Sequence, residues 1–388
     1  MAVGVEALQD LEAPPWLDAE GFRRCRQALD GKLARETWKY SPLPKVANAL
    51  IRADAHRQPP AVALPPEAAL HRLDESDAPP LEIDLNRYPL AGIAAARAGA
   101  GWLIDVKRTP SHPLRIPAPA PGAVAAPLLV RVAPGCRVEL EQEALPRNDG
   151  SPMPQPKRGG VAAMPSPAGL RAQVLVLSLA ADSEAHWAAA QFTPDVEEWS
   201  LLQAHLQRNA ALTLNQQCAV GGFLRQDVNV VLGGQGARLA SVGAALVRDG
   251  GRLDQQLVVE HASRGTVSRI KQHNLAAGRS RCTFNGRIHI HVGAAGADAD
   301  LSNRNLALDP SAEVNTKPEL EIYNDDVRCA HGATVGQLDA EALFYLLSRG
   351  LETWQAQRLL SLGFLRDGLA GPFAEPAAEA FAAHFASA

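Results

Sequence analysis

Cys329 and His331 are the residues of this 388-residue chain whose types and spacing most clearly suggest chemistry. They lie two positions apart in the segment VRCAH, and residues two apart on an extended strand project from the same face. A thiolate and a neutral imidazole are good ligands for iron and zinc, and histidine replaces cysteine on one iron of some clusters. The pair therefore predicts a site where both side chains address one metal, sulfur species or partner group, with a packing role as the alternative.

Other histidines and cysteines are placed less favourably for chemistry. His289 and His291 share one face of an expected strand and together would chelate a metal ion. A pair of histidines with no third ligand nearby in the sequence is, however, more often a structural feature than a metal site. We interpret His261 and Cys282 as structural for the same reason.

Several motifs of enzymes are absent from the sequence. Gly31-Lys32 is followed by leucine and has no glycine five residues earlier, so the chain has no P-loop for ATP. The glycines between Gly233 and Gly236 miss the dinucleotide-binding spacing, and no G-x-S-x-G elbow is present. The adjacent carboxylates at 325 and 326 would point to opposite faces of a strand, so we interpret them as part of a turn.

The elements that must position Cys329 and His331 are strands followed by a helix. Upstream, Leu320 and Ile322 alternate with polar residues, as a half-buried strand requires. Downstream, Asp339 is a candidate N-cap for a helix that ends at Gly350. The expected apolar face of this helix consists of Leu343, Leu346 and Leu347.

A longer β-region precedes this segment. From residue 212 to 329, short β-type runs follow one another about every 12 to 16 residues, and glycine or asparagine marks most of the joins. Regular short strands without helical crossovers are typical of a sandwich, a barrel or a solenoid, and the pattern does not choose among these. Residues 193–206 fit either a brief helix or a pair of strands.

Helical patterns flank the β-region on both sides. Asp18 is a candidate cap for a helix over residues 19–29, and an apolar stripe follows Gly350. The stripe consists of Ala356, Leu359, Leu360, Gly363 and Phe364. We expect an N-terminal helical region at 1–108, a β core at 109–336 with a mobile loop near 146–169, and a C-terminal helical subdomain at 337–388.

Composition limits the class of protein. With 46% hydrophobic and 21% charged residues the chain can bury a large core, and its net charge of −4 gives no basic surface for nucleic acid. The first twenty residues lack the basic start and apolar run of a signal peptide, and no stretch is long enough for a membrane span. Five scattered cysteines fit reduced thiols, so we expect a cytoplasmic protein.

Several segments of the chain resemble the SufB/SufD family of iron-sulfur cluster assembly scaffold proteins. The C-terminal signature of the family is matched by NRNLALD at 303–309, TKPELEIYNDDVRCAHGATVGQLDAEALFYL at 316–346 and SRG at 348–350. ARETWKYSPL at 34–43 is similar to an N-terminal segment of the SufD branch, and FNG at 284–286 to a third family element. Within the family, the wording ATVGQLDAEALFYL resembles SufD rather than SufB.

This resemblance implies both a fold and a role. It implies a right-handed parallel β-helix flanked by helical regions, in a non-catalytic scaffold that pairs with SufB and, through its C-terminal region, with the ATPase SufC. It also implies that His331, with Cys329 beside it, takes part in forming a transient cluster at the junction with SufB. A cluster typically has four protein ligands, and the sequence offers one cysteine and one histidine locally with no C-x-x-C, so the remaining ligands must come from a partner.

Two other functions stay open at this stage. A β-helix enzyme acting on carbohydrates would need acidic residues in a groove and would work without partners. A purely structural adaptor would bind SufB and SufC with no role for Cys329 or His331. The sequence also leaves open whether the isolated chain forms a homodimer and whether it binds a flavin.

Overall fold

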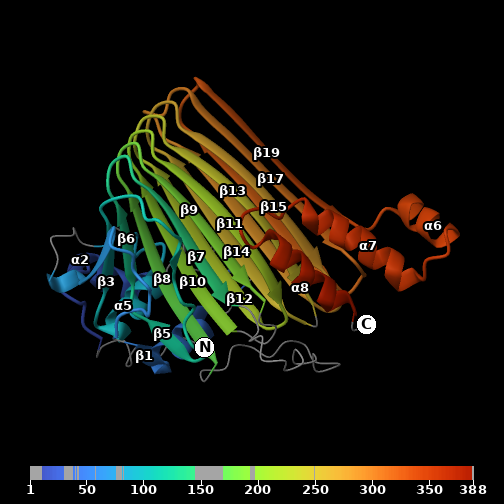
Figure 1. The fold of residues 1–388 in the computed structure, drawn as a ribbon, viewed down its shortest axis with the longest axis horizontal. Helices are drawn as coiled ribbons and strands as arrows, with labels where there is room; N and C mark the ends of the chain where they lie inside the picture. The colour runs from blue at the N-terminus through green and yellow to red at the C-terminus, as the bar shows by residue number, and fades with distance from the viewer. Residues whose placement is uncertain are drawn as a thin grey trace.

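The computed structural model describes residues 11–29, 38–39, 41, 43–56, 58–75, 81, 83–144, 169–192, 197–248 and 250–386. Within these ranges the chain winds into a stack of parallel strands, with helices at both ends of the sequence lying outside the stack (Figure 1). The proline- and glycine-rich loop expected near 146–169 lies outside the described residues, apart from Gly169.

Two parallel sheets make up the stack. From β6 onward the chain alternates between them, and each strand pairs in parallel with the strand two further along, so that every turn adds one strand to each sheet. The strands are β6 (Leu128–Val132), β7 (Arg137–Ala144), β8 (Leu170–Leu179), β9 (Glu184–Gln191), β10 (Glu197–Leu206), β11 (Ala211–Val220), β12 (Phe223–Leu232), β13 (Arg238–Val247), β14 (Arg252–His261), β15 (Val267–Ala276), β16 (Arg281–Ile290), β17 (Ala297–Ala307), β18 (Glu313–Ile322) and β19 (Val327–Gly336). The expected parallel β-solenoid is confirmed, with about seven turns. The undecided segment at 193–206 contains β10.

Alternation along each strand fills the space between the sheets. Leu257 and Val259 of β14, Ile288 of β16 and Leu301 of β17 belong to one buried apolar cluster that extends through both sheets. Their sequence neighbours point outward, because successive side chains on a strand alternate between faces. On the same strand, a residue two or four positions from one of these core residues therefore projects inward, and a residue one or three positions away projects outward.

Glycines stack at one corner of the solenoid. Gly236, Gly265 and Gly296 lie in the connections from β12 to β13, β14 to β15 and β16 to β17, and all three have φ between 63° and 74°. This left-handed conformation is costly for residues with a Cβ. Each glycine N–H donates to a carbonyl of the next turn, at 3.0 Å from Gly236 to Arg264 and 2.9 Å from Gly265 to Ala295. The corners thus extend the ladder of hydrogen bonds between turns.

The N-terminal part covers the outer face of the first turns (Figure 1). It contains α2 (Ala19–Ala28), α4 (Leu43–Arg52), β1 (Asp54–His56), β2 (Ala68–Arg72), η1 (Leu73–Glu75), α5 (Pro89–Ala98), β3 (Trp102–Val106), β4 (Leu114–Arg115) and β5 (Ala123–Ala125). The Asp18 carboxylate accepts hydrogen bonds from the backbone N–H groups of Glu20 and Gly21 at the start of α2, as predicted. Outward side chains such as Val174 and Trp199 share a buried cluster with α4 and α5.

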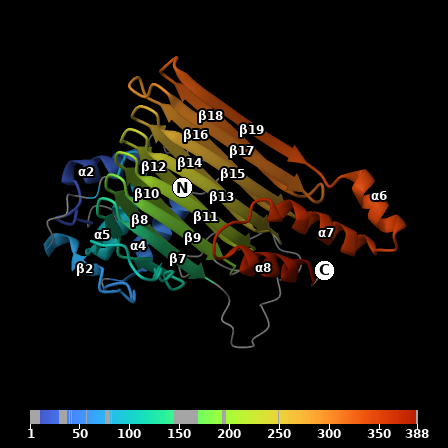
Figure 2. The same cartoon turned by 45° about the horizontal axis from the view of Figure 1, so that its top comes forward.

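Three helices follow β19, namely α6 (Ala340–Ser348), α7 (Thr353–Arg366) and α8 (Ala374–Ala386). Asp339 caps α6 as predicted, accepting hydrogen bonds from two backbone N–H groups. Helices α7 and α8 pack on the outer faces of β11, β13 and β15, whereas α6 projects away from the strands (Figure 2). No residue of α6 is fully buried. On its predicted apolar face, Leu343 and Leu346 are half-buried and Leu347 is exposed, so this face is only partly covered within the described part of the chain.

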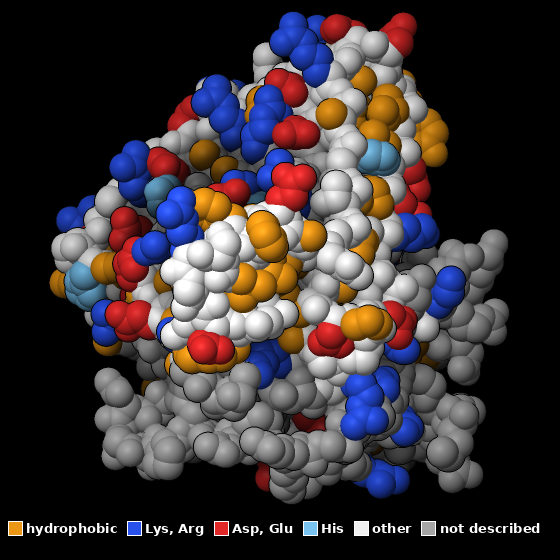
Figure 3. Space-filling view, turned by 90° about the vertical axis from the view of Figure 1, so that its right-hand side faces the viewer, with side chains coloured by type: hydrophobic (Ala, Val, Ile, Leu, Met, Phe, Trp, Pro, Cys, Tyr) orange, Lys and Arg blue, Asp and Glu red, His pale blue; other side chains and the backbone are white. Residues whose placement is uncertain are grey.

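The predicted stripe on α7 is only partly buried. Ala356 is buried, but Leu359 is 53% exposed, and the deepest positions of the helix also include Ser361 and Leu365. A short helix resting on a sheet buries only the face directed at the strands, so part of an apolar stripe can remain in contact with solvent. Figure 3 shows hydrophobic side chains gathered on the face of the molecule from which α6 projects.

The expected division into three regions stays a prediction. β3, within the region expected to be helical, pairs in parallel with β6, and β19 ends at the predicted limit of the β core, Gly336. Among the described residues, none of the helices has the length and apolar character needed to cross a membrane.

Candidate functional site

The last turn of the solenoid is uncovered. β18 pairs with β16 and β19 pairs with β17, and in the described structure neither strand has a neighbour on its other edge. Every residue of β18 and β19 is half-buried or exposed, in contrast to the largely buried strands before them. We call β18 and β19 together the open end, and Figure 2 shows it at the limit of the stack.

Cys329 and His331 lie side by side on the inward face of the open end. In register, Cys329 is opposite Ala299 and His331 is opposite Leu301, and both of these partners are buried in the core between the sheets. Cys329 is half-buried against that core, whereas His331 is exposed. The expected common face is therefore observed. An imidazole occupies the position where the preceding turn carries a leucine.

The thiol of Cys329 is held in its protonated form. Burial, followed by the negative charges of Asp298 and Asp300, raises the pKa of Cys329 above its ordinary value. The thiolate is the form that binds metals and attacks electrophiles. Cys329 can therefore become a ligand only when a metal ion or a base on a partner removes its proton, while the exposed imidazole of His331 is directly accessible.

Thiol alkylation compares the reactivity of Cys329 with that of the buried cysteines. Cys218 and Cys282 are buried, and burial raises the pKa of Cys218 to about 12 and also raises that of Cys282. With iodoacetamide at pH 7.5 we expect Cys329 to react slowly, and faster at pH 9, because the thiolate fraction grows with pH. Cys218 and Cys282 should stay unmodified until the protein unfolds. Peptide mass spectrometry over time gives the rates, and labelling of Cys218 as fast as that of Cys329 would contradict the structure.

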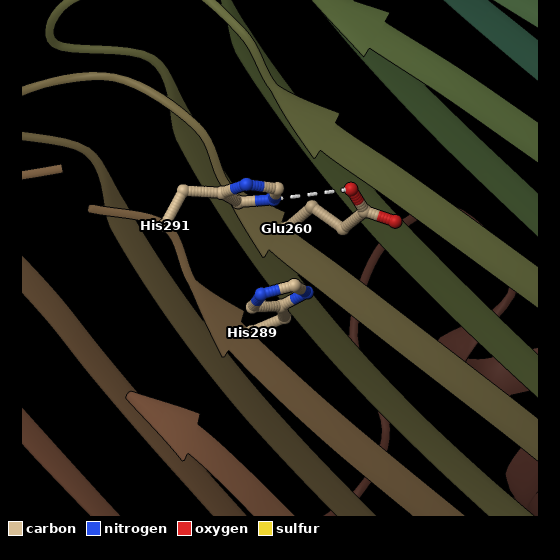
Figure 4. Close-up of side chains that lie close together, drawn as sticks. All are labelled: Glu260, His289 and His291. Atoms are coloured by element: carbon tan, nitrogen blue, oxygen red, sulfur yellow. Dashed lines mark hydrogen bonds and ion pairs between the residues drawn. The ribbon is translucent and has the colours of Figure 1, made fainter. Parts of the chain in front are cut away.

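The structure adds a third group to the histidine pair. Glu260 near the end of β14 lies beside His289 on β16 and His291 just after it, and one ligand atom from each lies within 4.8 Å of the others (Figure 4). Burial, followed by His291 and Arg287, lowers the pKa of His289. Sequence reasoning missed Glu260 because it lies on another strand. The signal that finds it is strand register, which pairs Glu260 with His289.

His261 and Cys282 occupy buried positions. The two ring nitrogens of His261 lie 2.9 Å from the hydroxyls of Thr266 and Ser268, and burial lowers the pKa of His261 to about 4. Cys282 packs in a small apolar cluster with Leu253. Both residues are placed as the structural interpretation expects.

A family model matches more than half of the chain. Residues 160–364 match the model described as SUF system FeS cluster assembly, SufBD core domain. The chain belongs to the SufBD family. The match runs from before β8 to near the end of α7, so it includes the open end and both residues of the Cys329–His331 pair.

Individual relatives support the same assignment. The chain is 37% identical to the iron-sulfur cluster assembly protein SufD of Escherichia coli over 144 residues, which is 37% of this chain and 34% of that protein. It is 32% identical to a SufBD family protein of Mycobacterium leprae over 183 residues, 45% of this chain and 47% of the relative. It is 30% identical to SufB of Bacillus subtilis over 135 residues, 35% of this chain and 30% of the relative. These alignments span only about a third to a half of each relative.

Proposed function

We propose that this chain is a scaffold subunit of the SUF system, of the SufD type, which forms nascent iron-sulfur clusters jointly with a SufB partner at the open end. The observation that carries the proposal is the exposure of His331, beside Cys329, on a final turn whose strands have unpaired edges among the described residues. An edge strand of this kind is a template for pairing with another chain. The partner would thus be joined at the same place where the ligands lie.

The donor groups at the open end support a shared cluster rather than a resident one. Iron-sulfur clusters are usually held by four protein ligands, and the described residues of the open end supply one thiol and one imidazole. The cluster is the product that is built and passed on. Ligands divided between two subunits would let it leave when the subunits move apart, so we assign His331 as the first ligand and Cys329 as a conditional one.

Exposed apolar side chains on or next to the strands of the open end support contact with a protein partner. Ile322, Tyr323 and Val335 are 44%, 59% and 53% exposed. Large exposed apolar groups next to an unpaired edge mark protein-protein contact surfaces. We propose SufB as the partner, and a second copy of this chain as the occupant when the protein is isolated.

The same reasoning assigns ATP hydrolysis to another subunit. The sequence has no P-loop, and α6 and α7 carry exposed apolar side chains. We propose that these helices bind the ATPase SufC in the cytoplasm. This chain then contributes interfaces and ligands and does not itself catalyse sulfur transfer or hydrolysis.

Substituting His331→Ala tests the function. In a complex reconstituted from the variant, SufB and SufC, we expect normal assembly and at least about ten-fold less cluster formed, since loss even of a ligand's supporting group commonly costs that much. Assembly is measured by size-exclusion chromatography, and cluster by anaerobic iron and sulfide analysis.

A matched control is His186→Ala, because His186 is half-exposed on β9 and its Nε2 is 2.8 Å from a carboxylate oxygen of Glu184. We expect this variant to form cluster like the unmodified chain. Cys329→Ser tests the contribution of the second ligand by itself, and it should reduce cluster formation less than His331→Ala does. Full cluster formation by a His331→Ala, Cys329→Ser double variant would leave this chain as a structural adaptor only.

A further inference from the structure

The outer face of the solenoid carries a group of three side chains of metal-ligating types, away from the inward face of the open end. Glu260, His289 and His291 each offer one ligand atom, and these atoms lie within 4.8 Å of one another (Figure 4). We propose that these three residues bind one divalent first-row transition metal ion of the zinc or iron(II) type, with coordination positions left open to water. The proposal does not depend on the function proposed above.

Rigid strands position the three ligands. β14 and β16 are neighbours in parallel, and their register places Glu260 opposite His289. Both side chains point outward, because Val259 and Ile288, next to them in sequence, lie in the core. The backbone N–H of His291 donates to the backbone carbonyl of His261 at 3.0 Å. This bond continues the ladder between the strands one residue past the end of β16. A site built on strands holds its geometry better than one on a loop.

The side chains already approach the geometry of a site. The imidazole rings of His289 and His291 are stacked with centroids 4.2 Å apart and an angle of 14°, and His291 Nε2 lies 3.3 Å from a carboxylate oxygen of Glu260. In a tetrahedral site with bonds near 2.0–2.1 Å, neighbouring ligand atoms are about 3.4 Å apart. Small rotations of half-exposed side chains would therefore bring all three groups onto one ion.

The donor set indicates which ions fit. Two imidazoles and one carboxylate form the ligand sets of open zinc sites and of non-haem iron(II) sites. Calcium and magnesium prefer oxygen ligands, so they fit poorly. Three protein ligands leave room for water or an incoming group, and the half-exposure of the rings gives an ion access, so binding should be exchangeable.

The surroundings favour a cation. Glu321 of β18 is opposite His289 in register and forms an ion pair with Arg287. Arg287 is the cation next to the site on β16, and the carboxylate of Glu321 offsets its positive charge. Tyr323 lies with its ring 5.4 Å from that of His289 and covers one side. The alternative is a simple ion pair between His291 and Glu260 with stacked rings and no metal, and an experiment separates the two.

Cobalt(II) is a suitable probe, since it replaces zinc and iron(II) and has visible absorption that reports its ligands. The full-length chain carrying Cys329→Ser and His331→Ala is made metal-free and titrated anaerobically, so that the open end does not contribute. We expect one equivalent to bind with bands typical of four- or five-coordinate cobalt. His289→Ala, His291→Ala and Glu260→Gln should each weaken binding at least about ten-fold.

The matched control is His186→Ala, which removes a half-exposed histidine paired with one carboxylate and lacking a third ligand among the described residues. It should titrate like the parent, and thermal unfolding should show that all variants are folded. The proposal is overturned if the parent takes up no cobalt, or if His289→Ala and His291→Ala bind the ion as tightly as the parent does.

Discussion

Replacing Arg225 by alanine is expected to lower the free energy of unfolding by about 3–5 kcal/mol, the largest stability effect we predict for a single side chain. Arg225 is fully buried and donates to Asp227 at 2.8 and 3.0 Å and to Asp254 at 2.6 Å. Its removal would leave two carboxylates in the protein interior without their cation. A buried charge that loses its partner costs far more than the pair itself contributes.

The same residue ties the N-terminal segment to the solenoid. The guanidinium of Arg225 lies 3.7 Å from the centre of the Trp38 ring, and Ser41 donates to Asp254. Trp199 Nε1 donates to Asp227 at 2.8 Å, so the carboxylates link three parts of the chain. We therefore expect the variant also to release the N-terminal segment, which limited proteolysis would detect before global unfolding.

Arg269→Ala is the matched control for charge removal. Arg269 pairs with Asp298 at 2.6 Å, but the two side chains are 47% and 35% exposed. Exposed pairs contribute about 0–1 kcal/mol, so this variant should unfold close to the unmodified chain. Denaturant titration followed by circular dichroism measures both variants. An Arg225→Ala variant that unfolds within about 1 kcal/mol of the control would show that the buried contacts of Arg225 do not make the predicted contribution to stability.

Local signals in the sequence predicted much of the fold. Asp18 and Asp339 were identifiable as caps because a carboxylate before an apolar-periodic run satisfies free backbone N–H groups whatever the tertiary structure. The common face of Cys329 and His331 follows from the period of a strand alone. The choice of a solenoid over a sandwich or barrel came only from the family resemblance, because all three are built from similar short strands.

Features that depend on the stacking of turns could not be read from the sequence. Glu260 lies beside His289 because β14 and β16 pair in a register that places the two residues opposite each other. The sequence of neither strand alone predicts that register. Arg225 and Asp254 meet for the same reason, 29 residues apart in the chain. On α7, Leu359 fits the apolar stripe but is exposed, because which part of the stripe is covered depends on where the helix rests.

If α6 binds the SufC ATPase as proposed above, Phe344→Asp should weaken that binding by roughly thirty-fold or more, while leaving the fold intact. Phe344 is 72% exposed, Tyr345 is 55% exposed, and α6 has no fully buried residue. A helix of this length is not stable by itself in water, so one held away from the strands with apolar side chains outward suits a docking element. Central aromatic residues of interfaces commonly contribute about 2 kcal/mol or more, which corresponds to that factor in Kd.

Val292→Asp is the matched control for this prediction. Val292 is 74% exposed, but it precedes β17, whereas α6 follows the end of the parallel neighbour β19, so the two residues lie at opposite ends of the strands. An equally exposed apolar side chain is thus changed to the same charge far from α6. Calorimetric titration with SufC should give unchanged affinity for Val292→Asp and a large loss for Phe344→Asp. Equal affinities for the two variants would mean that SufC binds elsewhere, and the exposed face of α6 would then need another partner.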